Sequence, residues 1–590
     1  MPASQDTAAL SLPGDVASCH EMLQGLARTL QERDRRIAQL EAAMDALIRQ
    51  RYAPKRERYT DPDQRLLFDE PGEVAEPLES PGEKEEDDSS AKKRGKRRGG
   101  KGRRILDAEA AREKLLHKLT DEQKVCPKCG APLVIVLVDG LLQWAHRPAE
   151  IYGIQHVHEK GFCQCCHEHV VVADKPPQMI EKGAADASLL AHLTTSNKGD
   201  HLPTYRYEEI SLRHGWWLPR STQVGWLGQT AVTAVILYSW MAGRVLGGKL
   251  LGTDATGVRV LEPGSGQAQK GTVWVYCGQR EVCPYLVYEY TRSGDGEAPR
   301  RFLDGYGGYL QADAASVFDQ LYRGGTVFEV ACGAHMRRYF YKARHSAALE
   351  AHRALVSFRQ LYMLERELAG VSDDERRALR QERALPILDE FKAWLDALAP
   401  VVVPKTELAT AVGYALNQWE AFVRYCDHGW LLIDNTRSER ALRPIAVGRN
   451  NWLFFGSDGG GRTGAILYSL VCSAKANRVH PYFYLEDIYR RLPKIRQHES
   501  LLPVLRDACG QVELPGGARP RLELLDSPLD YLRILKDHPR PLIERLRADS
   551  QLDPALVAEL NALLPDRWLS EHPEAFLEIN RRTRIVGEAA

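Results

Sequence analysis

The chain has 590 residues, of which 44% are hydrophobic and 27% charged, and its formal net charge is +0. This length predicts three or more folding units, and the composition is normal for a soluble globular protein. A net charge of zero favours no class of partner, and the start of the chain lacks the basic region and apolar run of a secretory signal. We therefore expect a cytoplasmic protein whose twelve cysteines bind metal or remain free thiols.

A helical repeat marks residues 1–60. Apolar residues recur at alternating steps of three and four from Leu23 to Leu47, and Arg33 occupies the one position that breaks the series. This spacing fits a short coiled coil that joins copies of the chain, and equally a helix that packs on its own domain. Residues 61–107 predict a disordered, charged linker, because an acidic block precedes a basic block. The basic block could bind phosphates or be a solvated linker.

A zinc-binding module is expected over residues 108–175, and residues 108–119 favour a helix at its start. Two pairs of cysteines have the spacing of zinc knuckles: Cys126, Cys129, Cys163 and Cys166. Four thiolates complete a tetrahedral site, so a bound Zn²⁺ would be structural. Three nearby residues are alternative ligands: Cys165, His167 and His169. Such a module could position nucleic acid or simply stabilise its own fold.

Residues 176–245 are expected to be helical. The segment 221–243 carries no charge and is long enough to span a bilayer, but its glutamines, threonines and glycines favour a buried helix. A break at Gly215 separates two helices, as in a helix-turn-helix or in an ordinary helical hairpin. In a helix-turn-helix, the first turn of the second helix meets base edges. The residues at that turn are Arg220, Ser221, Thr222 and Gln223.

Short β-prone runs come next along the chain. They lie at residues 249–253, 257–261, 272–277, 285–290, 308–312 and 326–331, with a helix expected at 314–322. Asp254 ends the first run and Asp313 ends the run at 308–312. This order is that of a ribonuclease-H-like sheet, in which a third carboxylate comes from a later helix. Taken alone, either aspartate could be a turn or cap residue.

Three such carboxylates suit the chemistry of phosphodiesters. In-line attack on a phosphodiester requires stabilisation of both the attacking and the leaving oxygen. Two Mg²⁺ ions roughly 4 Å apart do this, and hard oxygen ligands hold them. Residues 346–425 are predicted to be helical, and residues 491–590 show no chemistry.

The third carboxylate lies in a motif that resembles a known family. Residues 433–444 (Ile-Asp-Asn-Thr-Arg-Ser-Glu-Arg-Ala-Leu-Arg-Pro) resemble the Asp-Asn-Asn-x-x-Glu-Arg-x-x-Arg-Pro signature of transposases of the insertion sequence 66 family. Residues 448–457 resemble its Gly-Arg-Lys-Asn-Trp-Leu-Phe-x-Gly-Ser block, and residues 332–340 its Cys-x-x-His-x-Arg-Arg-x-Phe pattern. Residues 201–206, the cysteine pairs and residues 567–568 are similar too, so the resemblance spans most of the chain.

The resemblance implies a DDE transposase with an α/β, ribonuclease-H-like core. That core would comprise residues 246–345 and 426–490, with a helical insertion over residues 346–425. The catalytic triad would be Asp254, Asp313 and Glu439, holding two Mg²⁺ ions, with Mn²⁺ as a substitute.

Asp434, five residues before Glu439, is the alternative third ligand. The chain departs from the family pattern at Ala255, Thr436 and Asn450, where the family has Glu, Asn and Lys. None of these differences removes a carboxylate of the triad.

The resemblance further implies a bacterial insertion-sequence transposase that cleaves DNA at the ends of its element and joins them to a target. Its partners would be double-stranded DNA, further copies of the chain and accessory proteins of the element. Five arginines would contact DNA phosphates: Arg337, Arg338, Arg440, Arg443 and Arg449. Two alternatives stay open, a ribonuclease-H-like nuclease or resolvase that cleaves without joining, and a non-catalytic zinc-containing DNA-binding protein.

Overall fold

The computed structural model describes residues 16–52, 112–147, 150–166, 168–262, 267–280, 282–294, 296–514 and 516–573. The predicted linker over residues 61–107 and the candidate ligand His167 lie outside these residues. The chain divides into two compact units. The smaller unit combines residues 1–97 with residues 331–434, and the larger unit combines residues 98–330 with residues 435–590.

The N-terminal repeat is a single helix, α1 (Val16–Tyr52). Apolar side chains along it are exposed to solvent: Leu23, Leu26, Leu30, Ile37 and Leu40. The helix that the spacing predicts is therefore present, and the coiled coil stays a prediction.

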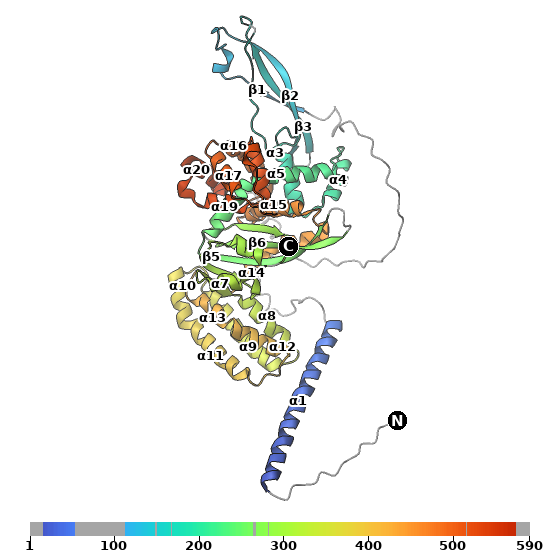
Figure 1. The fold of residues 1–590 in the computed structure, drawn as a ribbon, viewed down its shortest axis with the longest axis vertical. Coiled ribbons are helices and arrows are strands. Elements are labelled where there is room, and N and C mark those ends of the chain that lie inside the picture. Colours follow the sequence, from blue (N-terminus) through green and yellow to red (C-terminus); the bar gives the residue numbers. More distant parts are fainter. Residues whose placement is uncertain are drawn as a thin grey trace, which may run out of the picture. The chain divides into compact units, whose positions relative to one another are not determined.

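The other described part of the smaller unit is a helical bundle, yellow in Figure 1. Its helices are α8 (Gly333–Ala343), α9 (Ala348–Glu367), α10 (Asp373–Leu379), α11 (Leu385–Leu398), α12 (Glu407–Asn417) and α13 (Trp419–Val423). Buried aromatic rings from four of these helices form its centre: Phe340, Phe358, Phe391 and Phe422. Aromatic pairs in edge or tilted contact add to the stabilisation that burial provides.

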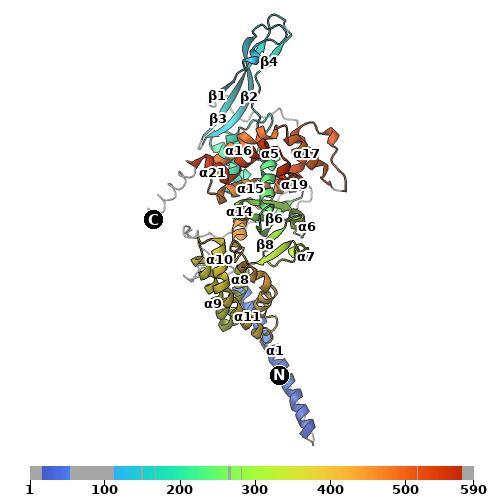
Figure 2. The same cartoon turned by 90° about the vertical axis from the view of Figure 1, so that its left-hand side faces the viewer.

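In the larger unit, residues 112–172 form a four-stranded sheet around a long hairpin (Figure 2). Its strands are β1 (Arg112–His117), β2 (Val134–Arg147), β3 (Glu150–Phe162) and β4 (Val170–Val172). Of the helix predicted for residues 108–119, the described part is wrong, because Arg112–His117 form β1, which pairs in parallel with β3. The ring of His117 stacks on His156 and His158, with centroids 5.3 Å and 4.6 Å apart. These long-range contacts outweigh the local helix propensity.

A second sheet of the larger unit has the strand order β7-β6-β5-β8-β9. Its strands are β5 (Leu250–Leu261), β6 (Ala268–Gly278), β7 (Leu286–Thr291), β8 (Gly308–Ala312) and β9 (Val327–Ala331). β5, β6 and β7 are antiparallel neighbours, and β8 runs parallel to β5. Numbered along the chain, this is a 3-2-1-4-5 order.

Two details of this sheet differ from the prediction. The runs at 249–253 and 257–261 form one continuous strand, because residues 253–257 keep their pairing with β6. Asp254 therefore lies within β5 rather than at a strand end. The helix predicted for residues 314–322 is reduced to a 3-10 turn (Ser316–Phe318) and the short helix α7 (Asp319–Arg323).

Side chains of β6 alternate between two hydrophobic clusters. Trp274 and Tyr276 join a cluster with α5 (Arg220–Leu246), whereas Val273 and Val275 join one with α14 (Thr436–Trp452) and α15 (Asp458–Ala476). Helices therefore cover both faces of the sheet, which suits its nearly continuous apolar strands.

Helix α5 is buried along most of its length, as predicted for its uncharged residues 221–243. Within the described residues, no helix combines the length and the apolar character needed to cross a bilayer.

Two short helices precede α5 in the chain, α3 (Ala187–Thr194) and α4 (Thr204–Arg213), and α6 (Glu297–Phe302) follows β7. The C-terminal region adds α16 (Pro481–Arg496), α17 (Leu501–Gly510), α18 (Pro528–Asp537), α19 (Arg540–Arg547), α20 (Pro554–Ala562) and α21 (Pro565–Glu571). Proline in the first turn starts several of them, because its missing N–H needs no partner there. Buried leucines of α18 and α19 belong to the same core as α5.

Candidate active site

The paired register of β5 and β8 ends shortly before Asp254 and Asp313. Gly252 on β5 is the partner of Gln311 on β8, and each aspartate follows its strand's paired residue by two positions. Side chains alternate along a strand and neighbouring strands lie about 4.8 Å apart. Asp254, two residues after Gly252 on a continuous strand, therefore faces the same side of β5 as Gly252, and the register continued by two residues would place Asp313 beside it.

That side of the sheet receives the N-terminus of α14. Asn435, which precedes the helix, donates a hydrogen bond from Nδ2 to the carbonyl oxygen of Thr253, at 2.7 Å. Its Oδ1 accepts a hydrogen bond from Ser438 Oγ, at 2.6 Å. A Cβ atom on Gly252 would lie 2.6 Å from Ser438 Oγ, so only glycine permits this approach. Asn435 and Ser438 are both buried.

Glu439 lies in the first turn of α14, beside these contacts, and is half-buried. Further along the helix, Arg449 Nη1 donates to Thr256 Oγ1 at 2.9 Å and to the Gly257 carbonyl oxygen at 2.8 Å. Tyr288 of β7 donates to the Ala441 carbonyl oxygen. α14 is thus fixed along β5 at both ends of the helix.

The three carboxylates do not form a compact ligand set. Within the part of the chain that the structure describes, the oxygens of Asp254, Asp313 and Glu439 do not all lie within 4.8 Å of one another. Carboxylate oxygens are the ligands that Mg²⁺ prefers, so the residue types suit a hard divalent cation. A metal site shared by the three residues stays a prediction.

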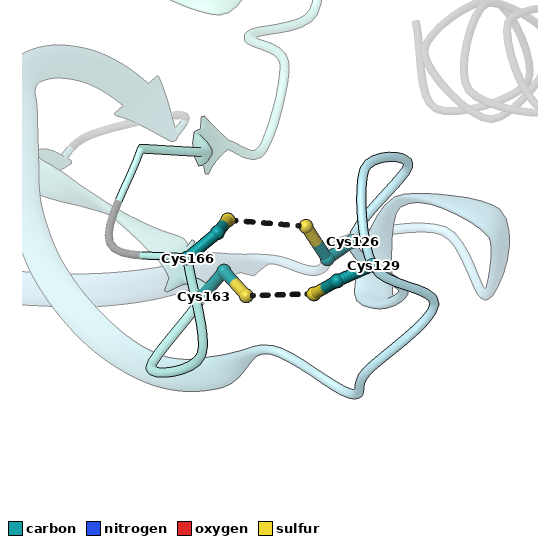
Figure 3. Close-up of side chains that lie close together, drawn as sticks. All are labelled: Cys126, Cys129, Cys163 and Cys166. Atoms are coloured by element: carbon teal, nitrogen blue, oxygen red, sulfur yellow. Dashed lines mark hydrogen bonds between the residues drawn. The ribbon is translucent and has the colours of Figure 1, made fainter.

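The four predicted cysteines converge in the hairpin module (Figure 3). Cys126 Sγ lies 3.6 Å from Cys166 Sγ, and Cys129 Sγ lies 3.5 Å from Cys163 Sγ. Sulfurs bound to one zinc ion at 2.3 Å in a tetrahedron are about 3.8 Å apart. This cluster could hold Zn²⁺ with no position left open.

Backbone groups favour the thiolate form of one of these cysteines, Cys163. The N–H groups of Cys166 and Cys165 lower the pKa of the Cys163 thiol to about 6. The alternative ligand Cys165 is exposed and does not belong to the four-sulfur set.

Residues 182–463 match the sequence model of the Transposase IS66 family. This segment is similar to the transposases of that family. It contains Asp254, Asp313 and Glu439, and it excludes the four cysteines.

Three proteins of Sinorhizobium fredii (strain NBRC 101917 / NGR234) are similar to the chain. Uncharacterized protein y4qI is 33% identical over 353 residues, which cover 57% of this chain and 65% of y4qI. Uncharacterized protein y4jD is 28% identical over 372 residues, covering 60% and 73%. Uncharacterized protein y4hP is 26% identical over 402 residues, covering 64% and 72%. The chain thus spans slightly less than two thirds of y4qI.

Asp434, the alternative third ligand within the matched segment, is engaged elsewhere. Its Oδ2 accepts a hydrogen bond from the Tyr362 hydroxyl of α9, at 2.7 Å, within the smaller unit. Burial, together with the charge of Asp434, raises the pKa of Tyr362 well above its ordinary value, so this hydroxyl keeps its proton. The contact favours Glu439 over Asp434 as a metal ligand.

The expected DNA-contacting arginines of the matched segment differ in exposure. Arg443 and Arg449 are exposed, and Arg440 and Arg338 are half-buried. Arg337 is only 6% exposed, and its guanidinium lies 5.8 Å from the centre of the Tyr341 ring. The expectation that Arg337 contacts DNA phosphates is therefore corrected, because its side chain packs inside the smaller unit.

The turn between α4 and α5 requires a second correction. Gln223 is 1% exposed, and its side-chain Nε2 donates to the carbonyl oxygens of Thr204 and Leu218 at 3.1 Å and 2.9 Å. Gln223 therefore fixes the turn and cannot read a base. Arg220 and Ser221 are exposed and Thr222 is half-buried. Arg220 lies 3.5 Å from Glu208, which balances its charge.

Sequence reasoning missed Gly252 and the docking role of Asn435. Gly252 is one of 47 glycines, and nothing in its local sequence distinguishes it. Asn435 gave a better signal, because an asparagine directly before a helical run is a frequent N-cap. Its side chain is used instead to join the helix to β5.

Proposed function

We propose that the chain is a DNA transposase of the DDE type with a ribonuclease-H-like core. The observation that supports this proposal most is the hydrogen bond of Asn435 to Thr253, which holds the first turn of α14, where Glu439 lies, against the strand that carries Asp254. The 3-2-1-4-5 strand order and the IS66 family match support it. Asp254, Asp313 and Glu439 would hold two Mg²⁺ ions.

The residues around the triad would bind and orient DNA. When bound, the two ions would stabilise the attacking and leaving oxygens of an in-line displacement. Arg443 and Arg449, both exposed on α14, would neutralise phosphates of the strand, and Arg440 would do so closer to Glu439. Four further residues remain proposed DNA contacts: Arg338, Arg220, Ser221 and Thr222.

Two successive displacements would complete transposition. Water attacks a phosphodiester at the element end, and the P–O bond to the leaving 3′ oxygen breaks, giving a 3′-hydroxyl and a 5′-phosphate. That 3′-hydroxyl then attacks a target phosphodiester, forming a new P–O bond and releasing a 3′-hydroxyl of the target. The same residues serve both displacements, because the substrates differ only in the attacking oxygen.

Glu439→Gln is the variant that tests this assignment, and Asp434→Asn is its matched control. With labelled element ends, supercoiled target and Mg²⁺, we expect wild type to nick and to join strands. Glu439→Gln should retain end binding and lose nicking, whereas Asp434→Asn should retain both. Nicking by Glu439→Gln would refute the triad. Nicking without joining in wild type would instead identify a nuclease, and binding without nicking a non-catalytic DNA-binding protein.

α1 would join copies of the chain. Leu23, Leu30 and Ile37 are more than half exposed, at 64%, 59% and 51%, although they repeat at the spacing of a coiled-coil seam. A second copy of α1 would remove them from water. Analytical ultracentrifugation should show an oligomer for wild type and a monomer for Leu30→Asp combined with Ile37→Asp. An unchanged oligomer would locate the interface elsewhere.

A further inference from the structure

The C-terminal region borders a cavity to which the proposed reaction gives no role. The cavity has a volume of about 730 Å³ and lies within the larger unit. The end of α5, the segment after β6, and helices α19, α20 and α21 line it. It is large enough for a nucleotide unit, and its chemistry can be read from the groups that face it.

Three arginines line this cavity: Arg244, Arg547 and Arg567. Arg244 lies 4.4 Å from the centre of the Trp240 ring and donates to Asn561 Oδ1 at 3.2 Å. Arg547 donates to the Gly305 carbonyl oxygen at 3.2 Å. Burial, and then the neighbouring Arg540, lower the pKa of Arg547, so its positive charge is poorly compensated.

The acidic groups at the cavity already have partners. Asp566 Oδ1 accepts a hydrogen bond from the Tyr285 hydroxyl at 2.6 Å. Glu571 Oε2 lies 3.4 Å from Arg491 Nη1. Arg567 lies 4.0 Å from Asp566, and its side chain is 72% exposed, so that contact is weak. The cavity therefore offers a ligand more hydrogen-bond donors than hydrogen-bond acceptors.

A buried donor adds a second, independent sign of a ligand. Trp240 lines the cavity and is 1% exposed, and its Nε1–H has no hydrogen-bond partner among the described residues. A buried N–H without a partner destabilises a protein by about 1–3 kcal/mol, so such groups are rare unless a ligand or water completes them. An acceptor-rich ligand with negative charge would satisfy this N–H and the arginines together.

The cavity also lies close to the first turn of α14. Arg437, two residues before Glu439, donates to the Gly278 carbonyl oxygen at the end of β6. Cys283, which lines the cavity, is within electrostatic range of both Arg437 and Arg244. Positive charge thus continues from the N-terminus of α14 to the cavity.

We infer that this cavity binds a phosphate group of the nucleic-acid strand whose cleavage is proposed above. This inference rests on the proposed function for its ligand. Guanidinium groups bind phosphate oxygens in pairs, and the indole N–H supplies a further donor. The C-terminal region would then hold the strand away from the reacting bond.

A pair of charge-neutral substitutions in the full chain tests the inference. Arg547→Gln with Arg567→Gln removes two cavity cations, and Arg519→Gln with Arg521→Gln removes two exposed arginines of the same region that do not line the cavity. Binding of a labelled single-stranded oligonucleotide is measured by anisotropy at several salt concentrations.

We expect the cavity variant to bind about tenfold more weakly. The slope of log K against log salt should fall by about 0.7 for each phosphate that the variant no longer neutralises, and the control should keep the wild-type slope. Equal binding of the oligonucleotide by the two variants would overturn the inference. The inference would also be overturned if the cavity variant lost binding of pyrophosphate but bound the oligonucleotide as wild type does. Arg567→Gln alone, at an exposed side chain, guards against misfolding and should give part of the loss.

Failure of the cavity is distinguishable from failure of the proposed reaction. The same binding measurement is made on Glu439→Gln, which should keep wild-type affinity. Cavity-dependent binding in a chain that never nicks DNA would support the cavity and refute the transposase. If wild type nicks DNA but binding of the oligonucleotide does not depend on Arg547 and Arg567, the transposase is supported and the role of the cavity is refuted.

Discussion

Asn435 donates a 2.7 Å hydrogen bond to the carbonyl oxygen of Thr253, the residue that precedes Asp254 on β5. This contact joins two segments that are 182 residues apart in the chain. Since Glu439 lies in the first turn of the helix that Asn435 precedes, the bond fixes where the third carboxylate lies relative to the first. The geometry of the proposed active site therefore depends on how closely α14 approaches β5.

Gly252→Ala should disturb this approach. The new Cβ would lie 2.6 Å from Ser438 Oγ and 3.0 Å from Asn435 Oδ1, so α14 must shift. We expect DNA nicking to fall at least tenfold, because shifts near 1 Å at a reacting centre have effects of this size, and stability to fall by about 1–3 kcal/mol. Gly257→Ala on the same strand is the control, because its Cβ would meet only Lys270 Cε, at 3.5 Å. Equal nicking by both variants would contradict this account.

Arg380 should be essential for the stability of the smaller unit. It is 1% exposed, donates to both carboxylate oxygens of Glu365 at 2.8 Å and 2.6 Å, and also donates to the carbonyl oxygens of Tyr425 and His428. Arg380→Met leaves Glu365 and these carbonyls without their partner, so we expect a loss of about 3–5 kcal/mol in urea unfolding.

Arg383→Met is the matched control for Arg380→Met. Arg383 pairs with Glu367 at 2.6 Å on the surface, where both side chains are about half exposed. Such pairs contribute about 0–1 kcal/mol. Comparable losses in the two variants would show that burial is not what makes Arg380 important.

Local patterns in the sequence predicted much of this fold. The uncharged stretch before Gly243 is a buried helix, and the β-prone runs correspond to the strands of the central sheet, because both signals depend on periodicity within one element. The two Cys-x-x-Cys pairs also converge, since their spacing determines the turn that presents the thiolates. Asp254 and Asp313 could be selected because each follows a β-prone run, and the paired register of β5 and β8 ends two residues before both of them.

The predictions from sequence were wrong where a contact between residues far apart in the chain determines the local structure. Residues 112–117 have helical propensity but pair with β3, and this pairing lies 41 residues away in sequence, from Arg112 to Gly153. Gln223 and Arg337 have the residue types of DNA contacts but are buried. Burial of one residue depends on the packing of several elements, and a single sequence gives no direct signal for it.

We expect zinc to be bound by the four clustered cysteines of the hairpin module and by no other cysteine of that module. Cys126→Ser removes one thiolate of the set, so purified protein should lose about one equivalent of zinc, measured by mass spectrometry of the metal. Cys165→Ser is the control, because Cys165 is exposed and outside the four-sulfur cluster. Proteolysis within residues 112–172 should accelerate in Cys126→Ser and after chelation, since a structural zinc stabilises the fold around it. Zinc loss in the control would show that Cys165 is a ligand instead.

Lys198 should make stability depend on pH in the alkaline range. It lies in the π-helical turn Thr195–Gly199, with Nζ 5.2 Å from the Tyr468 ring centre and 5.9 Å from that of Phe455. Burial lowers the pKa of Lys198 from 10.5 to about 8. Between these values the unfolded chain binds a proton that the folded chain lacks, so this residue makes stability rise with pH across that window. Below about pH 8 its burial is destabilising.

Lys198→Met should therefore stabilise the protein at pH 7. A shift of this size corresponds to about 3 kcal/mol, and removal of the two cation–π interactions offsets roughly 1–2 kcal/mol, so we expect a net gain of about 1–3 kcal/mol. The gain should shrink as the pH rises from 8 towards 10, because wild type no longer buries a charge there. Lys494→Met, at an exposed lysine of α16, should change stability little at any pH. A difference between Lys198→Met and wild type that stays constant from pH 7 to pH 10 would mean that the buried ammonium is not its source.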